Sequence, residues 1–149
     1  MSAELRELYQ ETIIDHGRHP RNFGELLTAN HHKEGFNPLC GDKIMLHVQE
    51  QDGVVEKIKF EGCGCAISMA SASLMTEALQ GKTKQDIGDI FDAFHDLVTE
   101  GRSSDILGKL TVLAGVHEFP VRVKCATLAW HTLKAALAND TNTVTTEET

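Results

Sequence analysis

Positive charge is scarce in this chain. Lysine and arginine number 14 against 22 aspartates and glutamates, which gives the 149 residues a formal net charge of −8. Nucleic acids and anionic membranes are bound through basic patches, so the sequence predicts neither as a partner. Long apolar runs are missing too, because no stretch approaches the roughly 20 residues of a membrane-spanning helix. Internal repeats are absent as well.

The first residues, MSAELRE, are rich in charge and lack the apolar centre of a signal peptide. We therefore expect a cytoplasmic protein, in a compartment where thiols stay reduced. With 24% charged and 41% hydrophobic residues, the composition is that of a soluble globular protein. The length fits one domain, which we expect over 1–138. Residues 139–149, rich in Thr, Asn and Glu, are expected to form a flexible tail.

The interpretation of the four cysteines depends on whether the compartment is reducing. In a secreted protein of this size they would indicate two disulfides. In a reducing compartment, a group of cysteines is more typical of metal binding or catalysis. Metal or sulfur chemistry is therefore the favoured interpretation before any motif is considered.

Helical structure is indicated by apolar residues that recur with a period near 3.6. The clearest segments are 5–13, 67–78, 87–98 and 126–137. The region between the last two has a weaker pattern and is expected to hold one short helix over 107–114. Pro120 marks the boundary before the last helix.

Extended structure is predicted between the first two helices. Apolar and polar side chains alternate over 43–49 and 57–61, and Asp52-Gly53 between these runs is a hairpin signal. A third short extended piece is expected over 62–65, and residues 20–38 are expected to form a loop. Together these elements indicate an α+β fold: a small three-stranded antiparallel sheet with helices packed mainly on one side.

Three cysteines fall at the predicted ends of these elements. Cys40 precedes the first strand, Cys65 lies between a strand and a helix, and Cys125 precedes or opens the last helix. Loops at element ends can gather on one side of a sheet, so these side chains can converge. A helix N-terminus also favours thiolate over thiol, the form needed for metal binding and sulfur transfer.

Asp42 completes the candidate site. It lies two residues after Cys40, and Gly41 between them allows the backbone to turn both side chains toward one point. Three sulfurs and one carboxylate oxygen form a plausible tetrahedral set for zinc. They also suit an iron–sulfur cluster, with oxygen as the weaker and more exchangeable ligand. The residues alone leave both possibilities open.

Several separated motifs, in order along nearly the whole chain, make the sequence similar to the SufU/IscU-type scaffold family, also called the NifU N-terminal domain family. They are Asp15-His16, Pro20-Arg21-Asn22, Asn37-Pro38-Leu39-Cys40-Gly41-Asp42, Phe60-Glu61-Gly62-Cys63-Gly64-Cys65-Ala66-Ile67-Ser68-Met69-Ala70-Ser71-Ala72-Ser73 and Lys124-Cys125-Ala126-Thr127-Leu128.

The resemblance implies that Cys40, Cys65 and Cys125 are the family's three functional cysteines and Asp42 its aspartate. It implies a protein that accepts persulfide sulfur from a cysteine desulfurase (SufS/IscS-like), scaffolds a nascent iron–sulfur cluster, or does both. The expected cofactor is Zn²⁺ or a transient [2Fe-2S] cluster, and downstream assembly or acceptor proteins are expected partners. Whether the protein is an enzyme in its own right stays open, because scaffold, sulfur carrier and sulfurtransferase are all compatible with the motifs.

The sequence resembles the SufU branch more than the IscU branch. Lys124 stands where IscU has a histidine before its third cysteine, and the stretch over 102–118 is an extra segment typical of SufU. Because SufU-like proteins resemble zinc-bound sulfurtransferases, the alternative is a zinc protein that activates the desulfurase without holding a cluster. A purely structural zinc module ranks behind it. A metal hydrolase ranks last, because no suitable base accompanies the ligands.

Cys40, on the loop before the first strand, is the expected sulfur-accepting nucleophile, since its thiolate can attack a persulfide as in thiol–disulfide exchange. Cys63 has two interpretations: a second thiol beside Cys65, or a small buried hydrophobe, which is favoured. His16, His19 and Arg21 surround a loop that can meet the desulfurase, although ordinary surface positions at a helix end are the favoured explanation.

Overall fold

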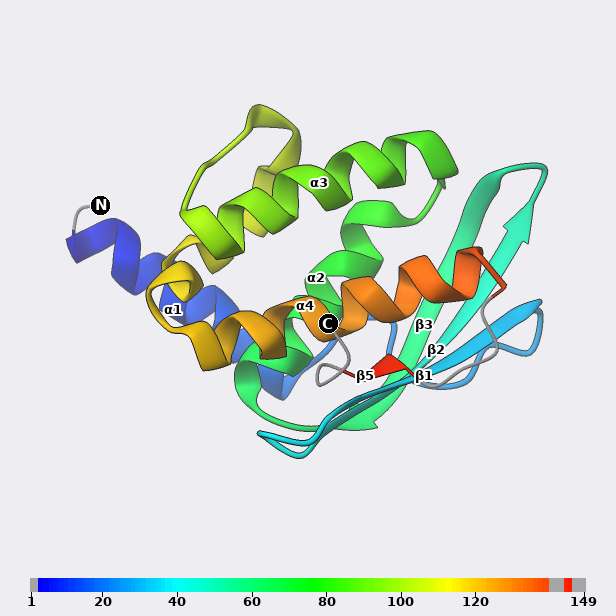
Figure 1. The fold of residues 1–149 in the computed structure, drawn as a ribbon, viewed down its shortest axis with the longest axis horizontal. Helices are drawn as coiled ribbons and strands as arrows, with labels where there is room; N and C mark the ends of the chain where they lie inside the picture. The colour runs from blue at the N-terminus through cyan, green and yellow to red at the C-terminus, as the bar shows by residue number, and fades with distance from the viewer. Residues whose placement is uncertain (1–2, 140–143, 146–149) are drawn as a thin grey trace.

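A computed structural model describes residues 3–139 and 144–145, and it confirms the α+β class (Figure 1). Its elements in chain order are α1 (Ala3–Arg18), β1 (His31–Asn37), β2 (Asp42–Gln51), β3 (Val54–Cys63), α2 (Ala66–Leu79), β4 (Lys82–Thr83), α3 (Lys84–Glu100), the 3₁₀ segment η1 (Asp105–Glu118), α4 (Pro120–Leu137) and β5 (Val144–Thr145).

The sheet is larger than the sequence predicted. It has five strands in the order β4-β3-β2-β1-β5, and the expectation of three antiparallel strands was wrong. Three neighbouring pairs are antiparallel, but β5 runs parallel to β1. The long strands β2 and β3 form the predicted hairpin, and their register shifts by one residue at Gln49/Glu50. The extra strands are the two-residue strands β4 and β5, one at each edge, and the sheet is mixed because β5 is parallel to its neighbour.

The strand β1 was predicted as loop because its sequence, HHKEGFN, is mostly polar. It alternates nonetheless: Lys33, Gly35 and Asn37 are buried toward the helices. A Cβ on Gly35 would collide with Thr132 of α4, so the helix packs directly on the backbone there. The third extended piece expected over 62–65 is also corrected, because residues 62–63 are the end of β3 rather than a separate strand.

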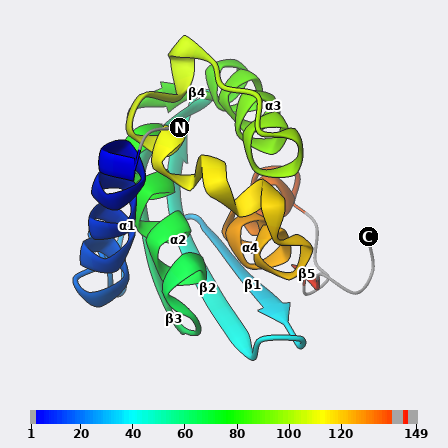
Figure 2. The same ribbon diagram turned by 90° about the vertical axis from the view of Figure 1, so that its left-hand side faces the viewer.

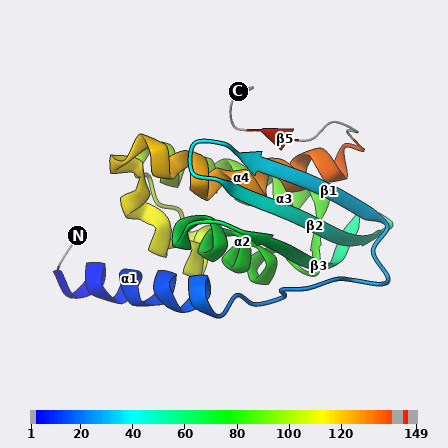
Figure 3. The same cartoon turned by 90° about the horizontal axis from the view of Figure 1, so that it is seen from below.

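Helices cover one face of the sheet, as predicted. In Figure 2, α2 and α4 lie across this inner face, α1 runs beside α2, and α3 lies above them. The inner face contributes Ile44, Leu46, Val48, Ile58 and Phe60 to the core, all fully buried. Figure 3 shows the opposite face of β1 and β2 with no helix in front of it. We call this the outer face of the sheet.

The two central helices are joined by buried polar contacts as well as apolar packing. The Ser71 hydroxyl donates to the Ala126 carbonyl at 2.6 Å, and the Trp130 indole donates to the same hydroxyl oxygen at 3.1 Å. Trp130 in turn stacks on Phe94 of α3, with ring centroids 4.1 Å apart. These contacts fix α4, and with it the position of Cys125, against α2.

The last helix begins earlier than expected. Pro120 marks the boundary of this helix, as predicted, because it is the first residue of α4, where a missing N–H costs nothing. The preceding segment is a 3₁₀ run over 105–118, interrupted at Gly108, rather than one short helix. Among the described helices, none is long and apolar enough to cross a membrane.

The flexible tail expected over 139–149 lies mostly outside the described residues. Of the residues that are described, Val144 and Thr145 pair with Gly35 and Phe36 of β1. The flexibility of the other tail residues stays a prediction.

Candidate metal centre

Ligand atoms from three elements meet at one end of the sheet. Cys40 lies in the turn between β1 and β2, Asp42 is the first residue of β2, and Cys125 lies in the second turn of α4. One ligand atom from each lies within 4.8 Å of the others. The Cys125 thiol donates to the Cys40 sulfur at 3.2 Å.

The tight turn between β1 and β2 brings Cys40 and Asp42 to the same point. Asn37 and Asp42 are directly paired across the two strands, which leaves only residues 38–41 for the turn. Gly41 has φ +69°, a left-handed conformation that glycine adopts without strain. The turn therefore folds back so that Cys40 lies beside the start of β2.

The carboxylate of Asp42 is held in place by two donors. Its Oδ2 accepts from the Asn37 amide at 3.0 Å, and its Oδ1 accepts from the Cys65 backbone N–H at 2.9 Å. Asp42 is fully buried, so these bonds compensate for much of its lost hydration. A Cβ on Gly64 would collide with this carboxylate, and Gly64 has φ +157°. Only glycine fits there.

Cys65 lies beside this group but is not part of it. It caps the N-terminus of α2, where its sulfur accepts from the Ser68 N–H at 3.5 Å. The structure thus brings Cys40, Asp42 and Cys125 together and places Cys65 next to them, joined to Asp42 through its backbone.

The electrostatics of the site depend on burial. Cys125 is fully buried, and this burial, with the hydrogen bonds that the thiol donates to Cys40 and Asp42, strongly raises the pKa of its thiol. The pKa of Arg122, one helical turn before Cys125, is shifted by the same group of sulfurs. Its pKa is raised mainly by the charge of Cys65 and further by Cys125 and Cys40, while burial opposes this. A bound cation would favour loss of the Cys125 proton, and Arg122 supplies positive charge at the rim.

Two residues of the site were missed by sequence reasoning. Asn37 is fully buried and also donates to the Cys125 sulfur at 3.5 Å, so it links a strand to a helix 88 residues away. Its position five residues before Asp42, across a turn, was the only local signal. No local sequence signal indicated Arg122, because it lies at the exposed start of α4 and that helix was predicted to begin later.

Cys63 is not the buried hydrophobe that was favoured. It is exposed and pairs with Lys43 across the sheet. Paired residues point to the same face, and Lys43 alternates with the inward Asp42 and Ile44. Cys63 therefore lies on the outer face, whereas Asp42 points inward.

His16 is a structural residue, not part of an exposed docking loop. It is 2% exposed, and its Nδ1 lies 2.8 Å from the Ser73 hydroxyl of α2. The same hydroxyl accepts from the Arg21 N–H at 2.8 Å. These two hydrogen bonds therefore hold α1 and the loop that follows it against α2.

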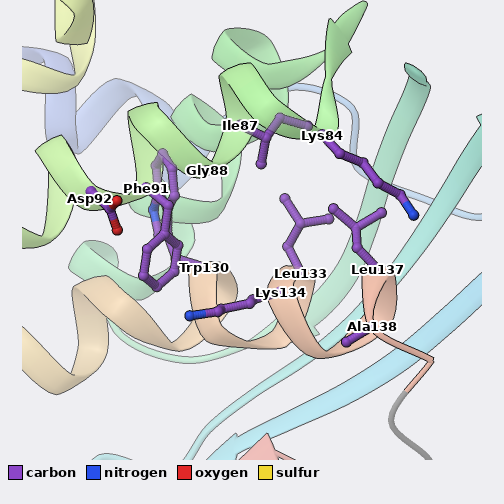
Figure 4. Close-up of a pocket in the computed structure, with 10 residues that line it drawn as sticks. All are labelled: Lys84, Ile87, Gly88, Phe91, Asp92, Trp130, Leu133, Lys134, Leu137 and Ala138. Carbon is purple, nitrogen blue, oxygen red and sulfur yellow. The ribbon is translucent and has the colours of Figure 1, made fainter. Parts of the chain in front are cut away.

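A separate pocket of about 420 Å³ lies between α3 and α4 (Figure 4). Its wall is mainly apolar, and the side chains of Ile87, Phe91, Trp130 and Leu133 face it. Lys134 lies over the Phe91 ring, 5.1 Å from its centroid. None of the four predicted site residues lines this pocket, so it is distinct from the metal centre.

The donors present suit a thiophilic metal. Two sulfurs and a carboxylate oxygen already converge, and the third sulfur is adjacent. Zinc takes such sulfur and oxygen donors in a four-coordinate arrangement, and iron–sulfur clusters are held mainly by thiolates. The chemistry of the donors therefore fits either group.

The family model described as NifU-like N terminal domain matches residues 8–126. The chain is 42% identical to the zinc-dependent sulfurtransferase SufU of Bacillus subtilis, covering 93% of this chain and 95% of that protein. It is 39% identical to the iron–sulfur cluster assembly scaffold protein IscU of Streptococcus pyogenes, covering 94% and 89%.

A solved structure of a SufU protein is also similar to this chain. A SufU from Fervidobacterium islandicum AW-1, described as a candidate iron–sulfur cluster assembly scaffold of the SUF system, superposes with a TM-score of 0.82. The two chains are 34% identical, and the match covers 89% of this chain and 98% of that one. The chain belongs to the NifU-like N-terminal domain family, in which SufU and IscU are its relatives.

Proposed function

We propose that this protein accepts persulfide sulfur from a cysteine desulfurase, in support of iron–sulfur cluster assembly. The observation that carries the proposal is the contact of two thiols and a carboxylate at one sheet end, with the Cys40 sulfur 3.2 Å from that of Cys125. Within this group Asp42 and Cys125 are fully buried, whereas Cys40 is partly exposed. Cys40 is therefore the member that a partner's sulfur can reach.

The chemical step is an exchange between sulfurs. The Cys40 thiolate attacks the outer sulfur of the partner's persulfide, a new S–S bond forms at Cys40, and the original S–S bond breaks. The partner's cysteine leaves as a thiolate, so electrons balance without an external oxidant. Arg122 lies at the rim of the site, where its positive charge is close to the sulfurs.

We assign Cys40, Asp42, Cys65 and Cys125 as the ligands of the metal or cluster. When bound, a cation such as Zn²⁺ would keep the sulfurs deprotonated. Asn37 and the Cys65 N–H orient the Asp42 carboxylate for this role. Free thiols of this kind require a reducing compartment, so we also propose a cytoplasmic location.

The test compares two cysteine variants. The protein is incubated with a cysteine desulfurase and L-cysteine, and bound sulfur is located by mass spectrometry after trapping with an alkylating reagent. Cys40→Ser should abolish sulfur uptake, because the attacking sulfur is gone. Cys63→Ser is the matched control and should take up sulfur normally, because Cys63 lies on the outer face. Full uptake by Cys40→Ser would refute the assignment.

A second candidate is a zinc-bound sulfurtransferase that activates the desulfurase without holding a cluster. The 42% identity to a protein named as a zinc-dependent sulfurtransferase favours it. Zinc and iron analysis with visible absorption after anaerobic purification separates the two. Zinc with no absorption, together with a stimulated desulfurase, supports the sulfurtransferase. Iron, sulfide and a visible spectrum support the scaffold. Tightly held zinc with no stimulation would indicate a purely structural site.

A further inference from the structure

Three polar side chains from adjacent strands meet on the outer face of the sheet, which Figure 3 shows without a covering helix. His32 of β1 is directly paired with His47 of β2. On β3, His47 pairs with Lys59, and Glu61 lies two residues after it. The Nδ1 atoms of the two histidines are 2.7 Å apart. His47 Nε2 lies 2.7 Å from Glu61 Oε1.

The carboxylate determines where the protons lie. Glu61 accepts, so His47 carries its proton on Nε2 and donates it. In the neutral His47 ring, Nδ1 therefore has a free lone pair, and His32 donates its Nδ1 proton to it. The rings are inclined at 73° to each other, and the short distance between their Nδ1 atoms puts both nitrogens at one place on the sheet. His47 is 8% exposed, whereas His32 is exposed, which leaves this place open on one side.

We propose that His32 and His47 form a binding site for a divalent transition-metal ion of the nickel, copper and zinc class, separate from the sulfur centre. Imidazole nitrogen is a preferred ligand of these ions. If His32 moves its proton to the exposed Nε2, both Nδ1 lone pairs become free, and no net proton is released. The imidazoles supply two ligands and water supplies the others.

The two nitrogens are already close to the spacing that a shared ion requires. Metal–nitrogen bonds are about 2.0–2.1 Å long, so two nitrogens on one ion are about 2.9 Å apart at right angles and about 3.3 Å apart in a tetrahedral arrangement. The observed 2.7 Å separation must therefore widen by about 0.2–0.6 Å, and the rings must turn so that both lone pairs are directed at the ion. Glu61 keeps its bond to His47 Nε2 and orients that ring, the usual role of a carboxylate behind a metal-bound histidine.

The test uses Ni²⁺ on protein whose sulfur centre is already saturated with zinc. We expect calorimetry to show one further equivalent of Ni²⁺ bound, with retained zinc measured afterwards. The ring C–H resonances of His32 and His47 should broaden selectively in NMR spectra. His32→Gln and His47→Gln should each weaken this binding at least tenfold. His117→Gln is the control, because His117 is exposed and lies on η1.

The exposed position of His32 keeps its variant informative even if His47→Gln perturbs the sheet. The proposal is overturned if no further equivalent binds, or if Ni²⁺ binds His32→Gln as tightly as the unchanged protein. Loss of zinc in step with Ni²⁺ uptake would also overturn it, because the nickel would then occupy the sulfur centre. None of these results depends on sulfur transfer.

Discussion

Replacing Asn37 by alanine tests how the sulfur centre is held together. Asn37 donates to Asp42 at 3.0 Å and to the Cys125 sulfur at 3.5 Å, and no solvent reaches it. One of its two acceptors, the Cys125 sulfur, becomes charged when a cation binds and Cys125 loses its proton. The lost hydrogen bonds therefore matter more in the metal-bound protein than in the metal-free one.

The size of the effect follows from the type of contact. Removing a partner that orients metal ligands lowers metal affinity about 10- to 100-fold, equivalent to about 1.4–2.7 kcal/mol. Hydrogen bonds to charged groups contribute about 1.5–3 kcal/mol each, which is consistent with this range. We expect Asn37→Ala to weaken zinc binding by such a factor and to lower the free energy of unfolding of the metal-free protein by less.

Zinc affinity is measured by competition with a chromophoric chelator, and stability by urea unfolding with and without zinc. The control is Asn30→Ala, because Asn30 makes two hydrogen bonds to the Glu50 backbone far along β2 from the site. It should lower stability without changing zinc affinity. If Asn37→Ala binds zinc within about threefold of the unchanged protein, Asn37 does not orient these ligands.

Three further changes have defined outcomes. Gly64→Ala should destabilise the fold by more than about 1 kcal/mol and lower its zinc content, because the added Cβ would collide with the Asp42 carboxylate and the backbone has a positive φ. Urea unfolding and metal analysis test this. A variant that is as stable and as zinc-loaded as the unchanged protein would contradict it. Gly88→Ala should raise the free energy of unfolding by about 0.5–1 kcal/mol in urea, because alanine has a higher helix propensity than glycine and nothing lies within 4 Å of the added Cβ. A loss of stability would refute this. Burial lowers the pKa of His16 below the ordinary 6.5, so the unfolded chain binds more protons and stability falls as pH drops below about 6.5. His16→Gln should flatten this slope in unfolding experiments from about pH 7 to 5, leaving the part due to His131, whose pKa burial also lowers; an unchanged slope would exclude His16.

The sequence predicted the long amphipathic helices and the central hairpin because their periodicity reflects burial directly. It did not predict β1, since the buried positions there are Lys33, Gly35 and Asn37 rather than apolar residues. Nor did it predict β4 and β5, because two-residue strands carry no measurable period. Their pairing is decided by neighbours distant in sequence.

The candidate site divides in the same way. Cys40 and Asp42 were identifiable because they are local to one turn, and Cys65 because it precedes a helical pattern. The roles of Asn37 and Arg122 depend on contacts with α4 and α2, which no short window of sequence contains. Cys63 was misassigned because two flanking glycines hid the strand alternation that turns it outward.

One strand register positions both the sulfur centre and the histidine pair. Asn37 pairs with Asp42, and five residues along the same ladder His32 pairs with His47. Five is odd, so side chains at these two steps point to opposite faces of the sheet. The carboxylate therefore faces the helices that carry Cys65 and Cys125, while the histidines lie on the outer face of the sheet. A slip of β1 by one residue would exchange the two faces. The four-residue turn that holds Cys40 thus fixes the geometry of both sites at once.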